Sequence, residues 1–310
     1  MVTTAFSYSG VIPILATPFH DDESLDLESF ERLIRFNAAL GVDAVTVTAL
    51  LGESNRLTDE ERERLVTTAV KAAGKLPVIV GTSHTGTAAT IALSRKAADL
   101  GATAVMITPS QQPVPNDKTV FDYFQRIAKQ ITVPIVLQDQ PAVTQVNMPV
   151  DLILNIVREI PSLVCVKAEA VPSPQKIAAL KKGLPPGRSV TILTGLGALY
   201  GIFDLERGSD GFNTGFAFPE VLIAMLEQFR AGNHPAVNRI FTKYLPLIVF
   251  EQQPGVAIRK EILRLRGLLT SNRVRHPGAT IDAATSEQLK RLLEATFPGE
   301  DITRPVKITP

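Results

Sequence analysis

The chain has 310 residues, 45% of them apolar and 20% charged, which is typical of a folded globular protein rather than a disordered or fibrous one. Its 32 basic and 31 acidic side chains give a net charge of +1, so no overall field attracts nucleic acid or an anionic membrane. No apolar run is long enough to cross a bilayer, and residues 1–20 lack the pattern of a secretion signal. We therefore expect a cytoplasmic protein that acts on a small molecule.

Short β-branched runs recur along the chain and alternate with helical patterns. Two of these runs, 41–48 and 101–108, are near copies, each introduced by the glycine that ends a helical pattern. The predicted strands are 11–16, 41–48, 77–82, 101–108, 133–138, 162–167, 190–194 and 210–215. The predicted helices, from the spacing of apolar residues, are 28–40, 59–73, 87–100, 119–130, 149–159, 174–182, 197–206 and 219–231.

Eight strand–helix units in succession predict a single α/β barrel. Parallel strands joined by right-handed crossovers are typical of a closed (β/α)8 TIM barrel, and a doubly wound open sheet is the alternative. The strand runs are apolar on both faces, as expected when helices cover the outside and side chains fill the inside. We assign residues 1–231 to the barrel. Residues 232–310 contain only helical patterns and are predicted to form a C-terminal helical extension, with helices at 234–250, 254–268 and 283–295.

Catalytic residues of such a barrel lie at the C-terminal ends of its strands, and Lys167 ends the sixth predicted strand. It follows the apolar run 163–166, which would remove its ammonium group from water and lower its pKa. A free amine at neutral pH can attack a ketone and form an imine, or Schiff base. For this residue alone, a lysine that reaches back to solvent is the simpler interpretation. Its position at the end of a barrel strand is what makes an imine-forming lysine an equally plausible interpretation.

Two glycine-containing loops follow other predicted strands. The loop 49–54 leads directly into a helix, so the backbone N–H groups of Leu50, Leu51 and Gly52 can converge on a carboxylate. The alternative is a plain turn whose leucines close the mouth of the barrel. The run 195–201 is similar to a dinucleotide-binding fingerprint, but six strand–helix units precede it, so we interpret it as a tightly packed barrel loop.

The other polar features have structural interpretations. The mixed-sign charge runs 21–23, 60–64 and 259–266 are typical of solvated helix faces. His84 has no orienting partner in the sequence, and Cys165 lies within an apolar strand as a core thiol. One cysteine excludes an internal disulfide, and the four histidines show no metal-ligand spacing, so we expect no metal.

Four motifs match one family: residues 10–19 at the first strand, 52–54 in the second loop, Lys167 on the sixth strand and Gly195 after the seventh. Together they resemble the dihydrodipicolinate synthase/N-acetylneuraminate lyase family of class I aldolases and dehydratases, over essentially the whole chain. The resemblance implies that Lys167 forms the imine with a 2-oxo acid without a cofactor. It also implies that the backbone at Leu50 and Leu51 binds the substrate carboxylate, and that the protein is a homo-oligomer, a tetramer or a dimer.

The chain departs from the family where the family has a tyrosine proton relay. The fifth strand ends in Gln138 and Asp139 instead of tyrosine and asparagine, and Ser110 with Gln111 replaces a pair of tyrosines. Because an amide cannot exchange a proton, Gln138 can only hydrogen-bond a substrate oxygen. We therefore expect another group to act as acid and base.

Glu169 is our first candidate for that role because it shares strand parity with Lys167, and Asp139 is the second. The alternative interpretation of Glu169 is a counterion or a helix cap. Ser110, Gly195 and Thr214 are further candidates for substrate contacts.

Three other departures from the family narrow the range of possible substrates. Val143 replaces the arginine of dihydrodipicolinate synthases, which argues against the lysine-biosynthesis reaction. Gly197 and Ala198 replace the acidic pair of sialic acid lyases, which argues against a long polyol substrate. The fifth-strand Gln-Asp pair and the motif 251–255 look like a divergent branch that includes dehydratases of 2-keto-3-deoxy sugar acids.

Three hypotheses follow. The first is a metal-independent class I lyase that dehydrates a short 2-keto-3-deoxy acid bound to Lys167. The second keeps the imine but assigns aldol cleavage or condensation, as in a pyruvate-dependent aldolase. The third is a non-catalytic protein that binds 2-oxo acids, which the missing tyrosines suggest; we consider it weaker, because a binder does not need a buried lysine that costs stability.

Overall fold

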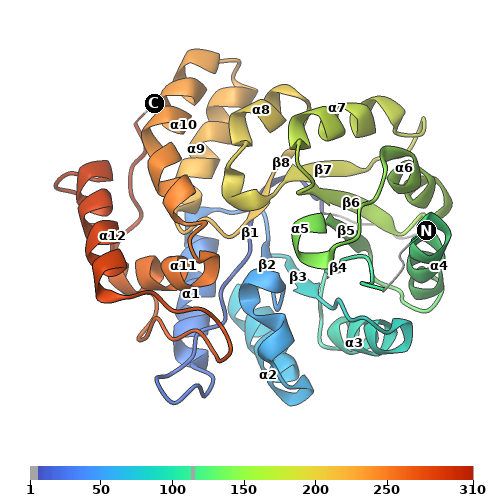
Figure 1. Cartoon of the computed structure of the whole chain (residues 1–310), viewed down its shortest axis with the longest axis horizontal. Helices are drawn as coiled ribbons and strands as arrows, with labels where there is room; N and C mark the ends of the chain where they lie inside the picture. Colours follow the sequence, from blue (N-terminus) through green and yellow to red (C-terminus); the bar gives the residue numbers. More distant parts are fainter. Residues whose placement is uncertain (1–5, 113–115, 310) are drawn as a thin grey trace.

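A computed structural model describes residues 6–112 and 116–309, and its strands form one parallel sheet that curls into a barrel (Figure 1). The strands are β1 (Gly10–Pro13), β2 (Val45–Val47), β3 (Val78–Gly81), β4 (Ala104–Ile107), β5 (Ile135–Asp139), β6 (Leu163–Ala168), β7 (Thr191–Thr194) and β8 (Gly211–Thr214). Every strand pairs in parallel with its neighbour in sequence from β2 to β8, and β1 pairs with β8. The fold is therefore the predicted (β/α)8 barrel with a C-terminal helical part.

The ring closes between β1 and β2 through a single parallel bridge from Ile14 to Thr46, where the Leu15 N–H donates to the Thr46 carbonyl at 2.9 Å. All other neighbouring strands pair within the sheet, although β7 and β8 share only the Thr194–Phe212 pair. The β1–β2 seam and the β7–β8 pair are thus the two places where neighbouring strands of the ring are least extensively paired. The β1–β2 seam lies next to the loop that contains the predicted carboxylate site.

Helices surround this ring, as expected from the spacing of their apolar residues. Those between the strands are α1 (Leu27–Leu40), α2 (Asp59–Ala73), α3 (Thr87–Asp99), α4 (Asp117–Ala128), α5 (Pro141–Thr144), α6 (Val150–Glu159), α7 (Ser173–Gly183), α8 (Gly201–Glu206) and α9 (Pro219–Arg230). Three short 3-10 helices lie in loops: η1 (Leu50–Gly52), η2 (Ser54–Arg56) and η3 (Leu196–Ala198). The single-turn α5 and the 3-10 helices are too short to produce a detectable period in the sequence.

Side chains fill the barrel in two layers. The inner layer is a small cluster of strand residues that includes Ile12, Met106, Val136 and Cys165. The outer and larger layer packs the opposite faces of the strands against the helices. Strand parity therefore decides whether a residue faces the interior of the ring or the helices.

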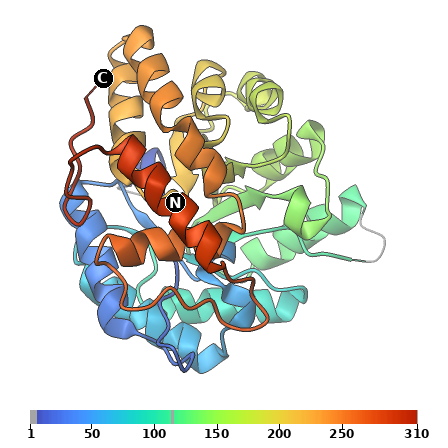
Figure 2. The same cartoon turned by 60° about the vertical axis from the view of Figure 1, so that its left-hand side comes forward.

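The C-terminal part consists of α10 (His234–Phe250), α11 (Gly255–Leu265) and α12 (Ala283–Thr296). Helix α10 packs against α9, and α12 packs against α10, as Figures 1 and 2 show on the orange and red side of the molecule. Helix α11 follows α10 after a short turn and lies beside the barrel, where its Arg259 contacts the loops after β7 and β8.

One prediction about this part is wrong. The charge run 259–266 is not a solvated helix face, because Arg259, Lys260, Glu261 and Arg266 are all buried. Each has an ionic or hydrogen-bonding partner, and for Lys260 and Arg266 that partner is a glutamate far away in the sequence, in the barrel. A periodic pattern shows only which residues share a face, so it could not reveal these distant partners.

Candidate active site

Lys167, Glu169 and Gln138 form a compact polar cluster at the C-terminal ends of β5 and β6. Lys167 has the same strand parity as Cys165 of the inner layer, so its side chain extends into the ring, and Gln138 stands opposite it in the β5–β6 register. The Lys167 Nζ lies 3.0 Å from Glu169 Oε2, and the Gln138 side-chain amide donates to the same oxygen at 2.7 Å. Lys167 is 2% exposed and Glu169 6%, so the cluster is nearly dry.

Burial lowers the pKa of Lys167, because an ammonium group loses hydration in the apolar ring. The carboxylate of Glu169 opposes this shift, and the positive charge of Arg259 adds to it. The direction is the one an amine nucleophile needs, since only the neutral amine has the lone pair that attacks a carbonyl carbon. Glu169 is placed to take the proton that Lys167 must lose.

The loop after β7 is built around Glu169. The Leu196 N–H donates to Glu169 Oε1 at 3.1 Å, so both carboxylate oxygens have a partner. A Cβ atom at Gly195 would lie 2.2 Å from the Glu169 Cγ, so only glycine leaves room for this side chain. Gly195 was predicted to contact substrate; the structure gives it a steric role beside Glu169. Thr214, another predicted substrate contact, accepts a hydrogen bond from the Gly197 N–H at 2.7 Å and so supports the same loop.

The loop after β2 presents part of the predicted carboxylate site. Within the described residues, no hydrogen bond engages the N–H groups of Leu50 and Leu51. The N–H of Gly52, in contrast, already donates to the Ala49 carbonyl at 2.9 Å. The inclusion of Gly52 as a carboxylate donor is therefore corrected, because its donor is used in the turn that shapes η1. Its carbonyl accepts from Thr17 Oγ1 at 2.6 Å, which fixes the loop to the segment that follows β1.

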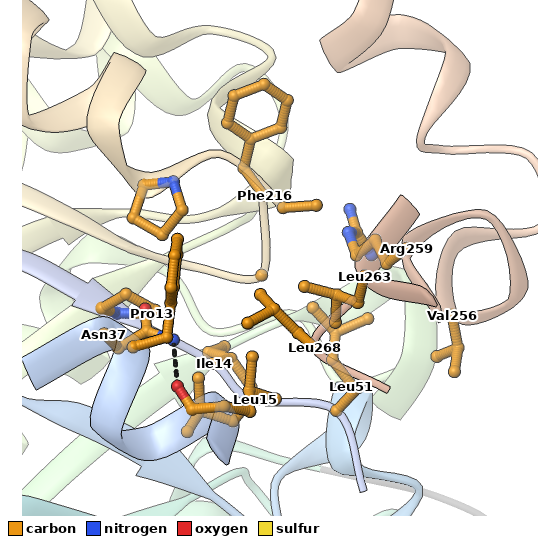
Figure 3. Close-up of a pocket in the computed structure, with 16 residues that line it drawn as sticks. Pro13, Ile14, Leu15, Asn37, Leu51, Phe216, Val256, Arg259, Leu263 and Leu268 are labelled. Atoms are coloured by element: carbon orange, nitrogen blue, oxygen red, sulfur yellow. Dashed lines mark hydrogen bonds between the residues drawn. The ribbon is translucent and has the colours of Figure 1, made fainter. Parts of the chain in front are cut away.

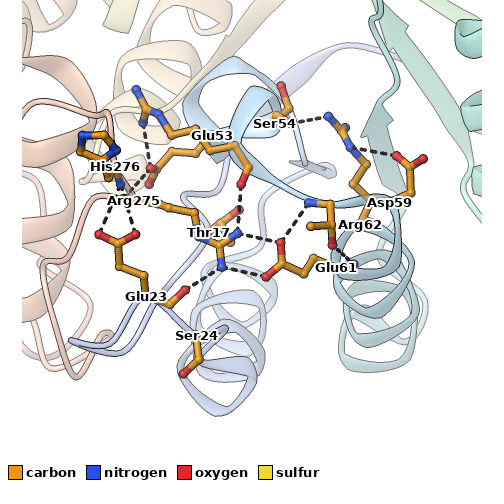
Figure 4. Close-up of polar contacts among 12 residues, drawn as sticks. Thr17, Glu23, Ser24, Glu53, Ser54, Asp59, Glu61, Arg62, Arg275 and His276 are labelled. Atoms are coloured by element: carbon orange, nitrogen blue, oxygen red, sulfur yellow. Dashed lines mark hydrogen bonds and ion pairs between the residues drawn. The ribbon is translucent and has the colours of Figure 1, made fainter.

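A partly buried ionic network holds this loop from the other side (Figure 4). Glu53 follows Gly52 in the left-handed conformation, and its carboxylate pairs with Lys260 of α11 and with Arg56 at 2.8 Å. Arg275 donates its backbone N–H to Glu53 at 3.0 Å, and its guanidinium pairs with Glu61 at 2.6 Å. The C-terminal part of the chain thus fixes the backbone that carries the Leu50 and Leu51 donors.

Two predicted site residues are not brought to Lys167. Asp139 has the opposite strand parity from Gln138, and its carboxylate pairs with Lys176 of α7 at 2.6 Å in the outer layer. Ser110 donates to the Thr85 carbonyl at 2.5 Å and lines a separate pocket beside α4. The assignments of Asp139 as acid or base and of Ser110 as a substrate contact are therefore corrected, since each side chain is engaged elsewhere.

Two residues that the sequence pattern did not indicate reach the mouth from the C-terminal part. Glu251, at the end of α10, is fully buried; it accepts from the Ala217 N–H at 3.1 Å and from Arg259 Nε at 3.0 Å. Burial raises the pKa of Glu251 to about 7, although Arg259 opposes the shift. The motif 251–255 was noted only as a family resemblance. Arg259 belongs to the charge run 259–266, but the sequence of this run does not show that its side chain is buried.

Arg259 also lines a pocket between the ends of β1 and β8 and the helices α1 and α11 (Figure 3). Apolar side chains such as Leu51, Phe216 and Leu263 form most of its wall, and Lys167 is not among its lining residues. The pocket therefore adjoins the loops at the mouth without containing the lysine. Arg259 connects the two regions, because it borders this pocket and also lies next to Gly197.

The remaining candidates have structural surroundings. His84 is exposed, and its Nδ1 accepts a hydrogen bond from the Gly86 N–H at 2.9 Å. Cys165 is fully buried, and burial raises the pKa of its thiol to about 12. Across residues 6–112 and 116–309, no group of three His, Cys, Asp or Glu side chains is arranged to hold a metal ion. In the same ranges no helix combines the length and apolarity that spanning a membrane requires.

Comparisons with known proteins agree with this architecture. The model of the dihydrodipicolinate synthetase family matches residues 7–296. The chain is 32% identical to L-2-keto-3-deoxyarabonate dehydratase of Azospirillum brasilense over 94% of this chain and 95% of that protein. It is 31% identical to 4-hydroxy-tetrahydrodipicolinate synthase of Chlorobium luteolum over 92% of this chain and 96% of that one. The crystal structure of dihydrodipicolinate synthase from Rhodopseudomonas palustris superposes with a TM-score of 0.88 and 38% identity, covering 93% of this chain and 97% of the other.

Proposed function

The chain belongs to the dihydrodipicolinate synthetase family, and from that premise we propose that it is a class I lyase that dehydrates a short 2-keto-3-deoxy sugar acid through an imine on Lys167. Membership makes it an enzyme of the dehydratase or aldolase kind that acts on a small molecule. The observation that supports dehydration is the contact of 3.0 Å between Lys167 Nζ and Glu169 Oε2, in the absence of a tyrosine hydrogen-bonded to either residue within the described part of the chain.

The first step is imine formation. Glu169 accepts the ammonium proton of Lys167, and the free amine attacks the C2 carbonyl carbon of the 2-oxo acid. The Nζ–C2 bond forms, and the carbonyl oxygen leaves as water with one proton from the nitrogen and the proton that Glu169 had accepted, so Glu169 is again a carboxylate. Meanwhile the substrate carboxylate accepts hydrogen bonds from the N–H groups of Leu50 and Leu51. No cofactor enters this step, because the protonated imine itself withdraws electrons from C3.

The second step is the loss of water from C3 and C4. The iminium makes the C3 proton acidic, and Glu169 Oε2, close to the imine nitrogen, takes that proton. The C4–O bond then breaks, and the leaving hydroxide receives the proton back from Glu169. Hydrolysis of the imine releases the dehydrated 2-oxo acid and the lysine. Gln138 donates to Glu169 and so holds the carboxylate that transfers the proton.

Gln138 also bears on the choice between dehydration and aldol cleavage. Cleavage requires a base for the C4 hydroxyl, which becomes a carbonyl, and a primary amide cannot accept that proton. Dehydration instead requires one group that moves a proton from C3 to the leaving oxygen, and Glu169 alone can do this.

The experiment is trapping followed by product analysis. The protein is incubated with pyruvate or a 2-keto-3-deoxypentonate, reduced with borohydride, and digested for mass spectrometry. We expect the mass increase on the peptide that contains Lys167, and a dehydrated 2-oxo acid in the unreduced reaction. Pyruvate release from the pentonate would identify an aldolase. Ligand-induced thermal stabilisation without trapping or turnover would identify a non-catalytic 2-oxo acid binder and refute the proposal.

We further propose that the protein assembles as a homodimer or homotetramer. Light scattering coupled to size exclusion tests this, since a 33.5 kDa particle would contradict it. Assembly is independent of the chemistry above, because every group assigned to the reaction lies within one chain.

A further inference from the structure

Arg259 combines deep burial with unused hydrogen-bonding capacity. It is 5% exposed, and its Nε donates to Glu251 at 3.0 Å. Among the residues that the structure describes, no acceptor engages its two terminal nitrogens, Nη1 and Nη2. A guanidinium group has five N–H donors, and the four on its terminal nitrogens are not used by the described part of the protein. Because Arg259 also lines a pocket, these donors are available to a bound acceptor.

Arg266, seven positions later, is a structural arginine in the same part of the molecule, and its hydrogen bonds provide the comparison. Its Nη1 and Nη2 donate to the Ala217 carbonyl at 2.6 Å and to Glu220 at 2.5 Å, and its Nε donates to the Ile302 carbonyl at 3.0 Å. The protein therefore can saturate a buried guanidinium when it serves the fold. Arg259 is not saturated in this way, so the Glu251 contact orients it and leaves its terminal nitrogens for another acceptor.

The terminal nitrogens lie beside the loop after β7, which contacts Glu169. A Cβ atom at Gly197 would be 3.1 Å from Arg259 Nη2, and Leu196, the preceding residue, donates to Glu169. On the other side, the Arg259 Cδ would be 3.6 Å from a Cβ at Gly215, in the loop after β8. Glycine at these positions leaves room for the side chains that pack there, which are Gln252 and Arg259 at Gly197 and mainly Leu51 at Gly215. The arginine thus lies at the mouth, one loop away from the carboxylate that serves the imine.

We propose that Arg259 binds the oxygen-bearing end of the substrate that is remote from the imine, a hydroxyl or a carboxylate at C5 of a 2-oxo acid. This rests on the proposed function, which anchors C1 at the loop after β2 and C2 on Lys167. The two terminal nitrogens form a planar fork suited to one or two oxygens. A substrate oxygen there supplies the acceptor that the protein does not. Arg259 therefore selects substrates that extend beyond C3 and carry oxygen at their far end.

The test compares substrates that differ only at the far end. Pyruvate stops at C3, a 2-keto-3-deoxypentonate carries a C5 hydroxyl, and a 2-keto-3-deoxy diacid of the same length carries a C5 carboxylate. In Arg259→Gln we expect KM for the pentonate to rise about ten-fold or more, because a hydrogen bond to a charged group is lost. The rise in KM is larger for the diacid if a C5 carboxylate is the natural acceptor. It is larger for the pentonate if a C5 hydroxyl is the natural acceptor. Borohydride trapping of pyruvate should reach half-saturation within about two-fold of the wild-type concentration.

Arg264→Gln is the matched control, because Arg264 is also on α11 and also pairs with a glutamate, Glu261 at 2.8 Å, but is 39% exposed in its side chain. It should leave KM for all three substrates unchanged. Arg259 also influences the pKa of Lys167, so all assays are run at the pH where pyruvate trapping has reached its plateau for each variant. An effect transmitted through Lys167 would alter pyruvate and the pentonate equally, and that result would overturn the inference, as would an unchanged pentonate KM.

Failure of the proposed function is recognised separately. If pyruvate is not trapped on the wild-type protein, the imine proposal is wrong whatever Arg259 does. Calorimetry in a Lys167→Met background then measures the contribution of Arg259 to pentonate affinity without any covalent step. We expect Arg259→Gln to weaken this binding about ten-fold; equal affinity with and without the arginine would refute the assigned role.

Discussion

Two buried lysine–glutamate pairs, Lys167 with Glu169 and Lys260 with Glu53, have the same chemistry but different surroundings. Lys167 is at the end of β6, and the only partner of its Nζ within the described residues is Glu169 at 3.0 Å. Lys260, on α11, pairs with Glu53, donates to the Arg273 carbonyl at 2.6 Å and lies 4.4 Å from the centre of the Phe19 ring. The first amine keeps donors that the described part of the protein does not use, whereas the second is saturated.

The difference shows that burial alone does not mark a reactive lysine. Burial lowers the pKa of both amines, that of Lys260 to about 8. What separates them is the number of partners, since an ammonium with acceptors on all sides has no room to approach a carbonyl carbon. We therefore assign chemistry to Lys167 and a structural role to Lys260, which positions the loop after β2. The following predictions test that division.

The largest effect is expected when each lysine is replaced by methionine and activity is measured. Lys167→Met should lower dehydration by at least about a thousand-fold, because no other amine can form the imine. Lys260→Met should retain borohydride labelling of the Lys167 peptide in its folded fraction. Labelling that disappears with Lys260 and persists without Lys167 would reverse the two assignments.

The next effect concerns the carboxylate beside Lys167. Glu169→Gln should lower kcat by about a hundred-fold or more while pyruvate is still trapped, because the amide cannot move a proton between C3 and the leaving oxygen. The matched variant is Asp139→Asn, on the neighbouring strand but paired with Lys176, and it should change kcat by less than about three-fold. Recording kcat against pH for both variants checks this; equal losses in the two would remove Glu169 from the mechanism.

A third effect concerns stability. Lys260→Met should lower the free energy of unfolding by about 3 kcal/mol, because it leaves a carboxylate in the interior without its ammonium partner. Lys290→Met removes the lysine of an exposed pair with Glu287 and should cost less than about 0.5 kcal/mol. Urea denaturation of both variants provides the comparison. Similar midpoints for the two would mean that the Lys260 pair contributes no more than a surface contact.

The last effect, which is the smallest per pH unit, is a pH dependence. The pKa of Lys260 is about 8 in the folded chain, below its ordinary value of 10.5, so between these pH values the unfolded chain binds more protons than the folded one. Stability from this group therefore increases as pH rises from about 8 to 10.5, by at most about 1.4 kcal/mol per pH unit. Lys260→Met lacks this slope. Subtracting its unfolding free energy from that of the wild type should give a difference that grows with pH; a difference that falls would contradict the lowered pKa.

Strand periodicity made the barrel and Lys167 predictable, because both depend on local sequence. Alternation along 162–167 places the lysine after an apolar run, and the shared parity of Lys167 and Glu169 places both side chains on one face. The same parity places Asp139, which follows Gln138 directly, toward the helices, so its position as well could be predicted from the sequence.

The contributions from the C-terminal part could not be predicted in this way. Arg259 and Lys260 belong to a charge run whose period resembles that of an exposed helix, and the partner of Lys260 is Glu53, about two hundred positions earlier. Nothing local distinguishes a charge that faces water from one that faces a distant counter-charge. The Gly52 donor was mispredicted for a related reason, since a loop's N–H groups are shared between its own turn and a ligand.

The rim residue Ala217 has its N–H bonded to Glu251 and its carbonyl bonded to Arg266. Both partners emerge from the ribosome after all eight strands have been made, so a nascent chain can assemble its ring before the entrance to that ring is finished. A polypeptide synthesised only as far as the last strand therefore lacks the groups that set the shape of the entrance, and competence for catalysis is delayed until residues 251–266 have been added. The order of synthesis thus separates formation of the scaffold from formation of the working enzyme.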